Sequence, residues 1–394
     1  MRSLEQALQQ MEAAQLRRRR VTVDSFTSPG ARVSLTAGGR ALTDFSSNDY
    51  LGLARHPALA QAMAECAHIA GAGSAASHLV SGHGREHQLL EEELADFTHR
   101  ERALLFTSGY AANLAVMTSL AGRGERAVLD RLCHASLIDG ARLSGAVLKR
   151  YAHADAKAAL HMLTAGDEAP ALLATDGVFS MDGDLAPLPQ LAQAASAAQA
   201  WLVVDDAHGL GVLGASGGGT LEHFGLDAQA APVLVGTLGK AFGSFGAFVA
   251  GDAALVEFLI QNARSYIYTT ALPQPVAAAT RAALVLVRGE GWRRERVHEL
   301  TRRFRARAQR AGVPLTDSAT PIQPVLLGSA AAALAAQAQL AAAGFLVIAI
   351  RPPTVPAGSA RLRVTLSAAH TEAQVDALVD ALAPACAHAR AGVA

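Results

Sequence analysis

The amino-acid sequence has little lysine, little cysteine and no excess of either charge, and each shortage excludes a class of protein. Its 394 residues include 34 basic and 34 acidic side chains, so the basic excess of a nucleic-acid-binding surface is missing. The three cysteines have no metal-ligand spacing, and their odd number indicates a reduced, cytoplasmic protein. We find neither an apolar run long enough to span a membrane nor the apolar core of a signal peptide, so we expect no membrane partner.

The shortage of lysine makes each remaining lysine informative. Only Lys149, Lys157 and Lys240 are lysine, and the other 31 (34 − 3) basic residues are arginine. A general compositional bias explains most of this shortage, as it does the abundance of alanine. Only lysine, however, offers an amine that can lose its proton and act as a nucleophile. A lysine that is kept in an unusual setting is therefore a candidate catalytic group.

Apolar runs alternate with helical patterns from residue 45 onward, in a chain that is 51% hydrophobic and can bury a large core. The expected strands are 104–106, 127–130, 146–148, 172–175, 201–206 and 233–236. The expected helices between them are 111–120, 135–143, 156–163 and 188–200. This alternation predicts an α/β domain over 45–285, whose mostly parallel sheet is covered on both faces and binds ligands at the carboxyl ends of its strands.

Two further parts flank this large domain. Residues 1–44 are expected to form an amphipathic helix over 3–20 and a linker. Residues 286–394 are expected to form a smaller α+β domain, with strands near 322–327, 346–350 and 362–366 and helices at 330–343 and 371–383. We expect its arginine-rich helix, 292–310, to present a solvated face; a binding surface for an acidic partner is the alternative.

Three familiar patterns lack the context that their chemistry requires. Gly209–Gly214 matches the G-x-G-x-x-G dinucleotide motif, and Ser216 lies in a G-x-S-x-G pattern. Both motifs need a helix directly afterwards, but the glycines that follow do not favour one. His83 and His87 are four residues apart, yet no third ligand is evident, so we expect packing or hydrogen bonding there and no metal site.

Lys240 and Asp205 form a more specific combination. Lys240 follows an apolar strand and lies among closely spaced glycines, a setting that favours the neutral amine needed for Schiff-base chemistry. Asp205 ends another buried strand, and His208 follows three residues later. A buried aspartate can pair with the protonated ring nitrogen of pyridoxal phosphate (PLP). A loop lysine and a helix-capping aspartate are the alternatives. The turn at Ser108–Asn113 also ends a strand and opens a helix, where amides could bind a phosphate.

At this point the sequence resembles the α-oxoamine synthases, which are fold-type I PLP-dependent transferases. The matching segments extend over nearly the whole chain, and together they are a specific signal. They are Phe45–Leu53, Ser108–Asn113, Asp130–Ser136, Asp176–Asp184, Asp205–Gly209, Thr237–Lys240, Ile350–Pro356 and Ala360–Leu366. The resemblance departs from the family pattern at His78, where many relatives carry arginine.

The resemblance implies a role for each matching residue. The implied catalytic residues are Lys240, which would form the Schiff base and act as the base, and His134, Asp205 and His208. The implied cofactor contacts are Gly109, Tyr110, His134, Ser180, Asp205, His208, Thr237 and Lys240.

The resemblance also implies substrate contacts. Asn48 and Arg363 would hold the carboxylate of the amino acid, with Arg361 as a second candidate, and His134 would contact the thioester. Thr354 and Arg17 would contact the acyl chain; Arg18 or Arg19 are alternatives, because the linker to Phe45 is longer than usual. Thr269 or Thr270 of the partner subunit would reach the phosphate of the cofactor in a homodimer with shared active sites.

The segment Ile350–Pro356 favours the member of the family that condenses L-alanine with a pimeloyl thioester and releases CO₂, in biotin biosynthesis. The thiol carrier would be coenzyme A or acyl carrier protein. Alternatives within the family are glycine C-acetyltransferase and 5-aminolevulinate synthase. Alternatives from other classes are a nicotinamide-dependent oxidoreductase, a serine hydrolase and a non-catalytic binding protein.

Overall fold

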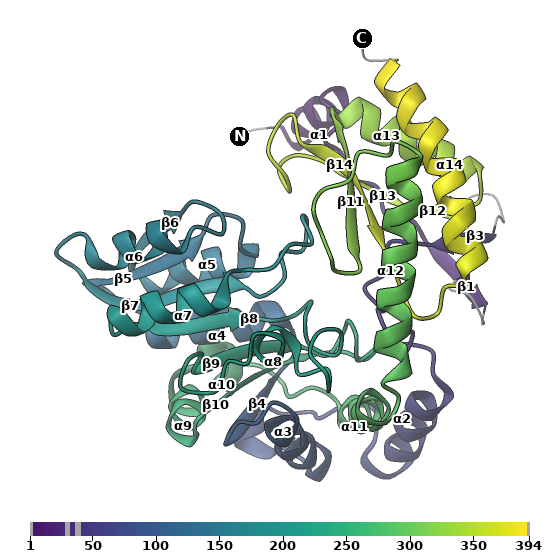
Figure 1. Ribbon diagram of the computed structural model, residues 1–394. Helices are drawn as coiled ribbons and strands as arrows, with labels where there is room; N and C mark the ends of the chain where they lie inside the picture. Colours follow the sequence, from purple (N-terminus) through teal and green to yellow (C-terminus); the bar gives the residue numbers. More distant parts are fainter. Residues whose placement is uncertain (1–2, 28–31, 36–40, 392–394) are drawn as a thin grey trace. The chain divides into compact units, whose positions relative to one another are not determined.

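The computed structural model describes residues 3–27, 32–35 and 41–391, which form two compact units (Figure 1). One unit comprises Leu51–Ser180 and Leu185–Arg294 and is called the sheet unit below. The other comprises the described residues of Met1–Tyr50, together with Met181–Asp184 and Glu295–Ala394, and is called the terminal unit. Within the described residues, no helix combines the length and apolarity that are needed to cross a membrane.

The sheet unit is built on a seven-stranded sheet. Its strands are β4 (Arg102–Phe106), β5 (Glu125–Asp130), β6 (Val147–Tyr151), β7 (Ala169–Asp176), β8 (Trp201–Asp205), β9 (Val233–Thr237) and β10 (Ala247–Gly251). Their order is β4-β10-β9-β8-β7-β5-β6; β10 is antiparallel to both neighbours, and the other pairs are parallel. This mostly parallel sheet confirms the fold-type I architecture.

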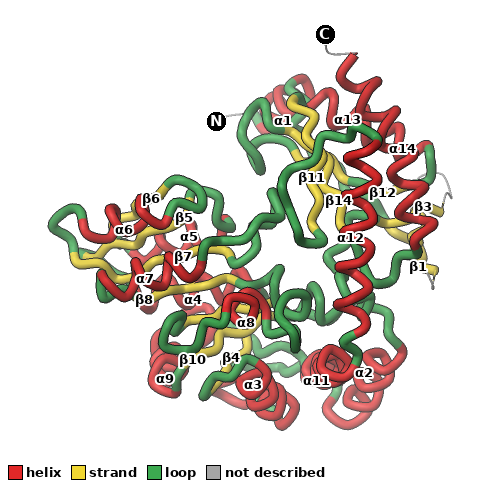
Figure 2. Tube along the Cα trace, in the orientation of Figure 1, coloured by secondary structure: helices red, strands yellow, loops and turns green. Residues whose placement is uncertain are grey.

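Helices cover the sheet, as Figure 2 shows in red beside the yellow strands. They are α2 (Pro57–Ala70), the π-helical turn η1 (His78–Gly82), α3 (Arg85–Phe97), α4 (Gly109–Leu120), α5 (Ala135–Ser144), α6 (Ala156–Thr164), α7 (Leu188–Ala197), α8 (Gly219–Phe224), α9 (Ala253–Asn262), α10 (Arg264–Ile267) and α11 (Gln274–Gly289). Adjacent strand residues belong to different clusters: Leu129 and Val203 pack with α4 and α5, whereas Val128 and Val204 pack with α6 and α7. Both sheet faces are therefore buried, which explains the unbroken apolar strands.

The terminal unit has two small sheets. One has the order β1-β2-β3-β12, from Val23–Thr27, Arg32–Leu35, Ala41–Asp44 and Phe345–Leu346; the other has the order β11-β14-β13, from Ile322–Gly328, Ala360–Thr365 and Ile348–Ile350. Its helices are α1 (Leu4–Ala13), α12 (Trp292–Arg310, from Glu295 onward), α13 (Ala330–Ala342) and α14 (Glu372–Ala391). Because β3 pairs with β12, the described N-terminal residues belong to the same unit as the C-terminal residues. The expected division at residues 44 and 286 instead separates 1–44 from 286–394.

The arginines of α12 face α14 rather than solvent alone. Arg303 makes a two-point contact with Asp376, at 2.7 and 2.6 Å. Arg296 lies 3.0 Å from Glu372, and Arg307 donates a hydrogen bond to Asp380 at 2.8 Å. The acidic residues repeat every four positions, which places them on one face of α14. Pairing with α14 therefore engages three of the eight arginines of α12.

Candidate active site

Lys240 lies on the tight connection that joins β9 to the antiparallel β10. The amide of Leu238 donates to the carbonyl of Gly246 at 2.9 Å, and Ser244 N donates to the carbonyl of Leu238 at 2.9 Å. Gly243 has a φ of +64°, and a Cβ there would lie 2.3 Å from the backbone nitrogen of Ala54, so only glycine suits this position. The connection holds Lys240 Nζ 2.8 Å from His208 Nε2.

Asp205 lies at the carboxyl end of β8 and is fixed by two donors. Its Oδ2 accepts a hydrogen bond from Asn113 Nδ2 at 2.6 Å, and its Oδ1 accepts from the amide of Ala207 at 3.1 Å. Asn113 comes from the second turn of α4 and is fully enclosed. Asp205 is only 7% exposed, so a cationic group bound in the same pocket would compensate a negative charge on it.

His134 forms the N-cap of α5, and its tautomer follows from its contacts. Its Nδ1 accepts from the amide of Ser136 at 3.3 Å and lies 2.6 Å from Ser136 Oγ. Ser136 Oγ accepts from Asn113 Nδ2 at 2.8 Å, so its own proton points to His134. The neutral ring therefore carries its proton on Nε2. His134 N also donates to Asp176 Oδ1 at 3.0 Å.

Asp176 ends β7 beside Asp205, and the two carboxylates affect each other. Burial, followed by the negative charge of Asp205, raises the pKa of Asp176 well above its usual range. Both strands end at the same edge of the sheet, where parallel strands place their ligands. The shift favours the protonated form of Asp176, which leaves Asp205 as the carboxylate at this edge that can pair with a ligand carrying a positive ring.

The start of α4 supplies the anion-binding part of this pocket. Ser108 caps the helix, its Oγ accepting from the amide of Ala111 at 3.2 Å. The first amides of a helix have no acceptor within the helix and attract a phosphate. A Cβ at Gly109 would meet no atom within 4 Å, so the space in front of these amides is open. Tyr110 is held beside it by a 2.7 Å hydrogen bond to Asp139.

These side chains surround one cavity of about 170 Å³ in the sheet unit. All eight predicted cofactor contacts line it: Gly109, Tyr110, His134, Ser180, Asp205, His208, Thr237 and Lys240. It offers an amine for an aldehyde, a buried carboxylate for a ring nitrogen and helix amides for a phosphate. This donor set fits PLP.

The predicted carboxylate-binding residues lie in the terminal unit. Arg363 Nη1 donates to Asn48 Oδ1 at 3.1 Å and to Thr365 Oγ1 at 3.2 Å. Arg361, two residues away, instead forms a 2.5 Å ion pair with Asp182 and donates to the carbonyl of Met181. The geometry therefore favours Arg363 over Arg361 as a substrate contact.

The predicted acyl contacts are also in the terminal unit. α1 ends at Ala13, and Gln15 has a positive φ of 56°, so the arginine run lies outside the helix that we expected over 3–20. Arg18 Nη2 donates to Thr354 Oγ1 at 2.9 Å, whereas Arg17 lies 3.4 Å from Glu12. Of the open alternatives, Arg18 is the arginine that contacts Thr354.

The segment that contains the G-x-G-x-x-G match at Gly209–Gly214 and the G-x-S-x-G match at Ser216 is bonded to Glu222. Glu222 accepts hydrogen bonds from the amides of Ser216 and Gly218 and from Ser216 Oγ. The amides after Gly209–Gly214 are thus bonded to the side chain of Glu222, and Ser216 has a carboxylate rather than a histidine as its partner. This arrangement supports neither dinucleotide binding nor a serine nucleophile.

Sequence reasoning gave no role to Asn113, Ser136 or Asp176. All three are buried and polar, and all lie within motifs that the resemblance had already identified. A buried asparagine one turn inside a helix next to the expected phosphate site was an available signal. The link from Asn113 to both Asp205 and Ser136 appears only in three dimensions.

Comparisons with known proteins agree with this chemistry. A family model for aminotransferase classes I and II matches residues 40–382. The 8-amino-7-oxononanoate synthase of Cellvibrio japonicus is 57% identical over 373 residues, covering 95% of this chain and 93% of that protein.

Two solved structures are also similar. Serine palmitoyltransferase of S. paucimobilis, with a bound PLP–myriocin aldimine, gives a TM-score of 0.92 at 28% identity, over 99% of this chain and 98% of that one. The 8-amino-7-oxononanoate synthase of Francisella tularensis gives 0.77 at 32% identity, over 87% and 97%. The chain therefore belongs to the class I and II aminotransferase family and, within it, to the PLP-dependent 8-amino-7-oxononanoate synthases.

Proposed function

We propose that this protein condenses L-alanine with a pimeloyl thioester to give 8-amino-7-oxononanoate, CO₂ and the free thiol carrier, in biotin biosynthesis. The observation that carries the proposal is the cavity in which Lys240, His208 and Asp205 converge, in a chain 57% identical to a synthase of that name. When it is bound, PLP supplies an electron-accepting ring that makes the Cα–H bond of the amino acid acidic.

Asp205 would pair with the ring nitrogen of the cofactor and favour its protonated form. Its carboxylate is held in place by Asn113 Nδ2 and by the amide of Ala207, so it cannot rotate away from the pocket. In a buried site the pairing of this negative charge with a ring cation is stronger than in water. The start of α4 with Gly109 and Tyr110, and Thr237 at the end of β9, would hold the phosphate.

Lys240 Nζ would be the base that accepts the Cα proton of alanine. Its contact with His208 Nε2 at 2.8 Å fixes the amine at the pocket wall and gives its proton a hydrogen-bond partner. The short connection from Leu238 to Gly246 limits the freedom of the lysine backbone. Little ordering is then required when the substrate arrives.

His134 polarises the carbonyl of the thioester. Because Ser136 fixes its Nδ1 as an acceptor, the Nε2–H is the donor that the developing oxyanion needs. The nucleophilic Cα of alanine attacks this carbonyl carbon and the thiol leaves. The resulting β-keto acid loses CO₂, because its ketone stabilises the electron pair that remains.

The carboxylates of alanine and of the pimeloyl chain would be bound by residues of the terminal unit. Arg363 and Asn48 bind the carboxylate of alanine, for which a planar guanidinium provides two parallel hydrogen bonds. A pimeloyl chain ends in a second carboxylate, and Arg18 with the hydroxyl of Thr354 suits that group. Arg296, Arg303 and Arg307 of α12 are paired with α14, so these three arginines do not favour acyl carrier protein over coenzyme A.

The protein is further proposed to act as a homodimer, to which Thr269 or Thr270 of the partner subunit contributes a phosphate contact. Large apolar side chains are exposed on the sheet unit at Leu79 (50%), Val80 (79%) and Tyr268 (71%), and association would bury them. Light scattering should give about twice 40.7 kDa. A monomer that is fully active at the same dilution would refute shared sites.

The direct test is borohydride reduction of the yellow holoenzyme followed by peptide mapping. The reduced cofactor should be attached to Lys240 and absent from Lys157, which is exposed on α6 and serves as the control lysine. If Lys240→Ala still binds the cofactor covalently, the assignment fails.

Substrate identity is tested by CO₂ release from alanine and from glycine, each with pimeloyl, acetyl and succinyl thioesters. Alanine with the pimeloyl thioester should be fastest. A preference for glycine would assign the protein to another reaction of the same cofactor chemistry. Running the pimeloyl reaction with coenzyme A and with acyl carrier protein then identifies the carrier.

A further inference from the structure

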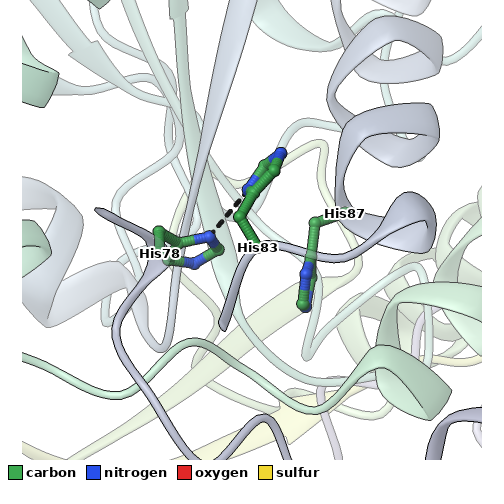
Figure 3. A group of neighbouring side chains, drawn as sticks. All are labelled: His78, His83 and His87. Atoms are coloured by element: carbon green, nitrogen blue, oxygen red, sulfur yellow. Dashed lines mark hydrogen bonds between the residues drawn. The ribbon is translucent and has the colours of Figure 1, made fainter. Parts of the chain in front are cut away.

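Three histidine rings converge in the sheet unit, in a cluster that the proposed reaction does not use. His78 opens η1, His83 follows it, and His87 lies in the first turn of α3 (Figure 3). The three ring centroids are 5.2, 5.1 and 5.6 Å apart, so the rings surround one point. One nitrogen of each ring lies within 4.8 Å of the others. The structure thus supplies the third ligand that the spacing of His83 and His87 lacked.

The tautomers of two rings are set by oxygen acceptors on the outside of the cluster. His87 Nε2 donates to the carbonyl of Leu272 at 2.6 Å, and His83 Nε2 lies 3.3 Å from Gln88 Oε1. With their protons on Nε2, both rings carry their lone pair on Nδ1. A carbonyl oxygen behind the outer nitrogen is the arrangement that orients histidine ligands in metal sites.

The inner nitrogens have few competing partners. His78 Nδ1 lies 2.9 Å from His83 Nδ1, and this contact needs a proton or a cation between two lone pairs. His87 Nδ1 accepts a 3.0 Å hydrogen bond from the amide of Gly84, which an ion would replace. The exchange costs two neutral hydrogen bonds, the one from Gly84 and the one between His78 and His83, and gains coordination by three nitrogens.

The surroundings of two of the rings, His78 and His87, disfavour their charged form, and a histidine must be neutral to bind a metal. Burial and then the neighbouring histidines lower the pKa of His78 to about 3, and burial lowers the pKa of His87. The nearby carboxylate of Glu86 is bonded to Arg281 at 2.8 Å rather than to a ring.

Side-chain and backbone contacts also hold the cluster in place. The ring of Tyr266 stacks on His78, with centroids 4.9 Å apart and an interplanar angle of 13°. A Cβ on Gly82 would lie 2.1 Å from the carbonyl oxygen of Ala76, so η1 closes tightly at that glycine. His83 is only partly buried, which leaves an approach from solvent.

We propose that His78, His83 and His87 form a binding site for one divalent first-row transition ion, Zn²⁺ above all, with water as the fourth ligand. The ion joins η1, α3 and, through the carbonyl of Leu272, the segment before α11. Three imidazoles and a water make a tetrahedral set that Zn²⁺ and Co²⁺ accept readily. None of the three histidines lines the cavity around Lys240.

The test is equilibrium dialysis of the holoenzyme against Zn²⁺, with the bound metal measured by atomic emission. Co²⁺ is used in parallel, because its visible spectrum reports coordination geometry. Holoenzyme is used so that the cofactor occupies the Lys240 pocket. The wild-type protein should bind one ion per chain, give a tetrahedral Co²⁺ spectrum and melt at a higher temperature with Zn²⁺.

Two variants remove single ligands. His83→Ala changes a partly buried ring, and His78→Arg keeps a planar group over Tyr266 but offers no lone pair. Each should weaken Zn²⁺ binding by roughly 100-fold or more and abolish the thermal shift. His161→Ala, an exposed histidine on α6, is the matched control and should bind like the wild type.

Three results would contradict the proposed metal site. Equal Zn²⁺ uptake by the wild type and His83→Ala would overturn the proposal, as would a wild type that binds no ion. The same loss in His161→Ala would also overturn it, because it would indicate nonspecific histidine binding. If His78→Arg fails to fold, His83→Ala with its unchanged cofactor content decides the question alone.

Discussion

The contact between Asn113 and Asp205 should contribute measurably to cofactor affinity, and Asn113→Ala tests it. Asn113 Nδ2 donates to the Asp205 carboxylate at 2.6 Å and to Ser136 Oγ at 2.8 Å. A hydrogen bond to a charged acceptor is worth about 1.5–3 kcal/mol. Since 1.4 kcal/mol is a factor of ten, PLP should bind the variant ~10- to 100-fold more weakly.

The measurement is an absorbance titration of the apoprotein with PLP. Asn262→Ala, which loses one exposed hydrogen bond to the carbonyl of Phe258, is the control and should keep wild-type affinity. Ser136→Ala removes the contact with His134 but leaves the bond to Asp205, so it should lower kcat more than it weakens cofactor binding.

Stability should change less than cofactor affinity in Asn113→Ala. The Oδ1 atom of Asn113 is buried and has no hydrogen-bond partner among the described residues, so truncation also removes an unfavourable group. The reasoning is refuted if the variant, folded by circular dichroism, binds PLP within twofold of the wild type. A large fall in melting temperature with unchanged affinity would refute it as well.

Three further predictions concern substrate, pH and helix pairing. Arg363→Lys loses the two-point grip, so kcat/KM for L-alanine should fall ~10- to 100-fold in steady-state assays while PLP affinity is unchanged. Burial raises the pKa of Asp206 to about 7. The folded state therefore holds this proton more tightly than the unfolded chain, whose value is about 3.9, and stability falls as pH rises from ~4 to ~7. Asp206→Asn keeps an acceptor for the amide of Thr220 and should raise the unfolding free energy by up to ~4 kcal/mol at pH 8 and leave it unchanged near pH 4; a larger gain at pH 4 would contradict this. Arg303→Ala breaks the pairs with α14 and should lower stability by about 1 kcal/mol in urea unfolding, whereas the exposed Arg302→Ala should not; equal effects would exclude a specific pairing.

The parallel strands of the sheet unit could be predicted because burial on both faces leaves an unbroken apolar run. Strand β10 was not predicted, because Ala247–Gly251 is a short segment that directly follows a glycine-rich turn. The expected strand 346–350 is two strands in different sheets: Phe345–Leu346 pairs with β3, and Ile348–Ile350 pairs with β14. The division arises because β12 pairs with β3, about 300 residues earlier in the chain, whereas β13 pairs with β14. The local sequence pattern does not encode these pairing partners.

The candidate site was predictable where chemistry requires one residue type at a strand end, as at Lys240, Asp205 and His208. Residues that act through others were not predictable. Asn113 and Ser136 meet only because α4 and α5 pack together. His78 joins His83 and His87 through the tight turn at Gly82, whose shape has no signature in residue spacing.

The antiparallel strand β10 has a consequence for how such an enzyme can change during evolution. Surface loops usually tolerate insertions, because a longer loop costs little extra closure entropy. The connection that carries Lys240 is different: its ends are bonded to each other between Leu238 and Gly246, and its middle touches the backbone of Ala54 at Gly243. An inserted residue there would move the amine away from His208. New substrates must therefore arise from changes elsewhere in the chain, and the length of this one segment should stay constant.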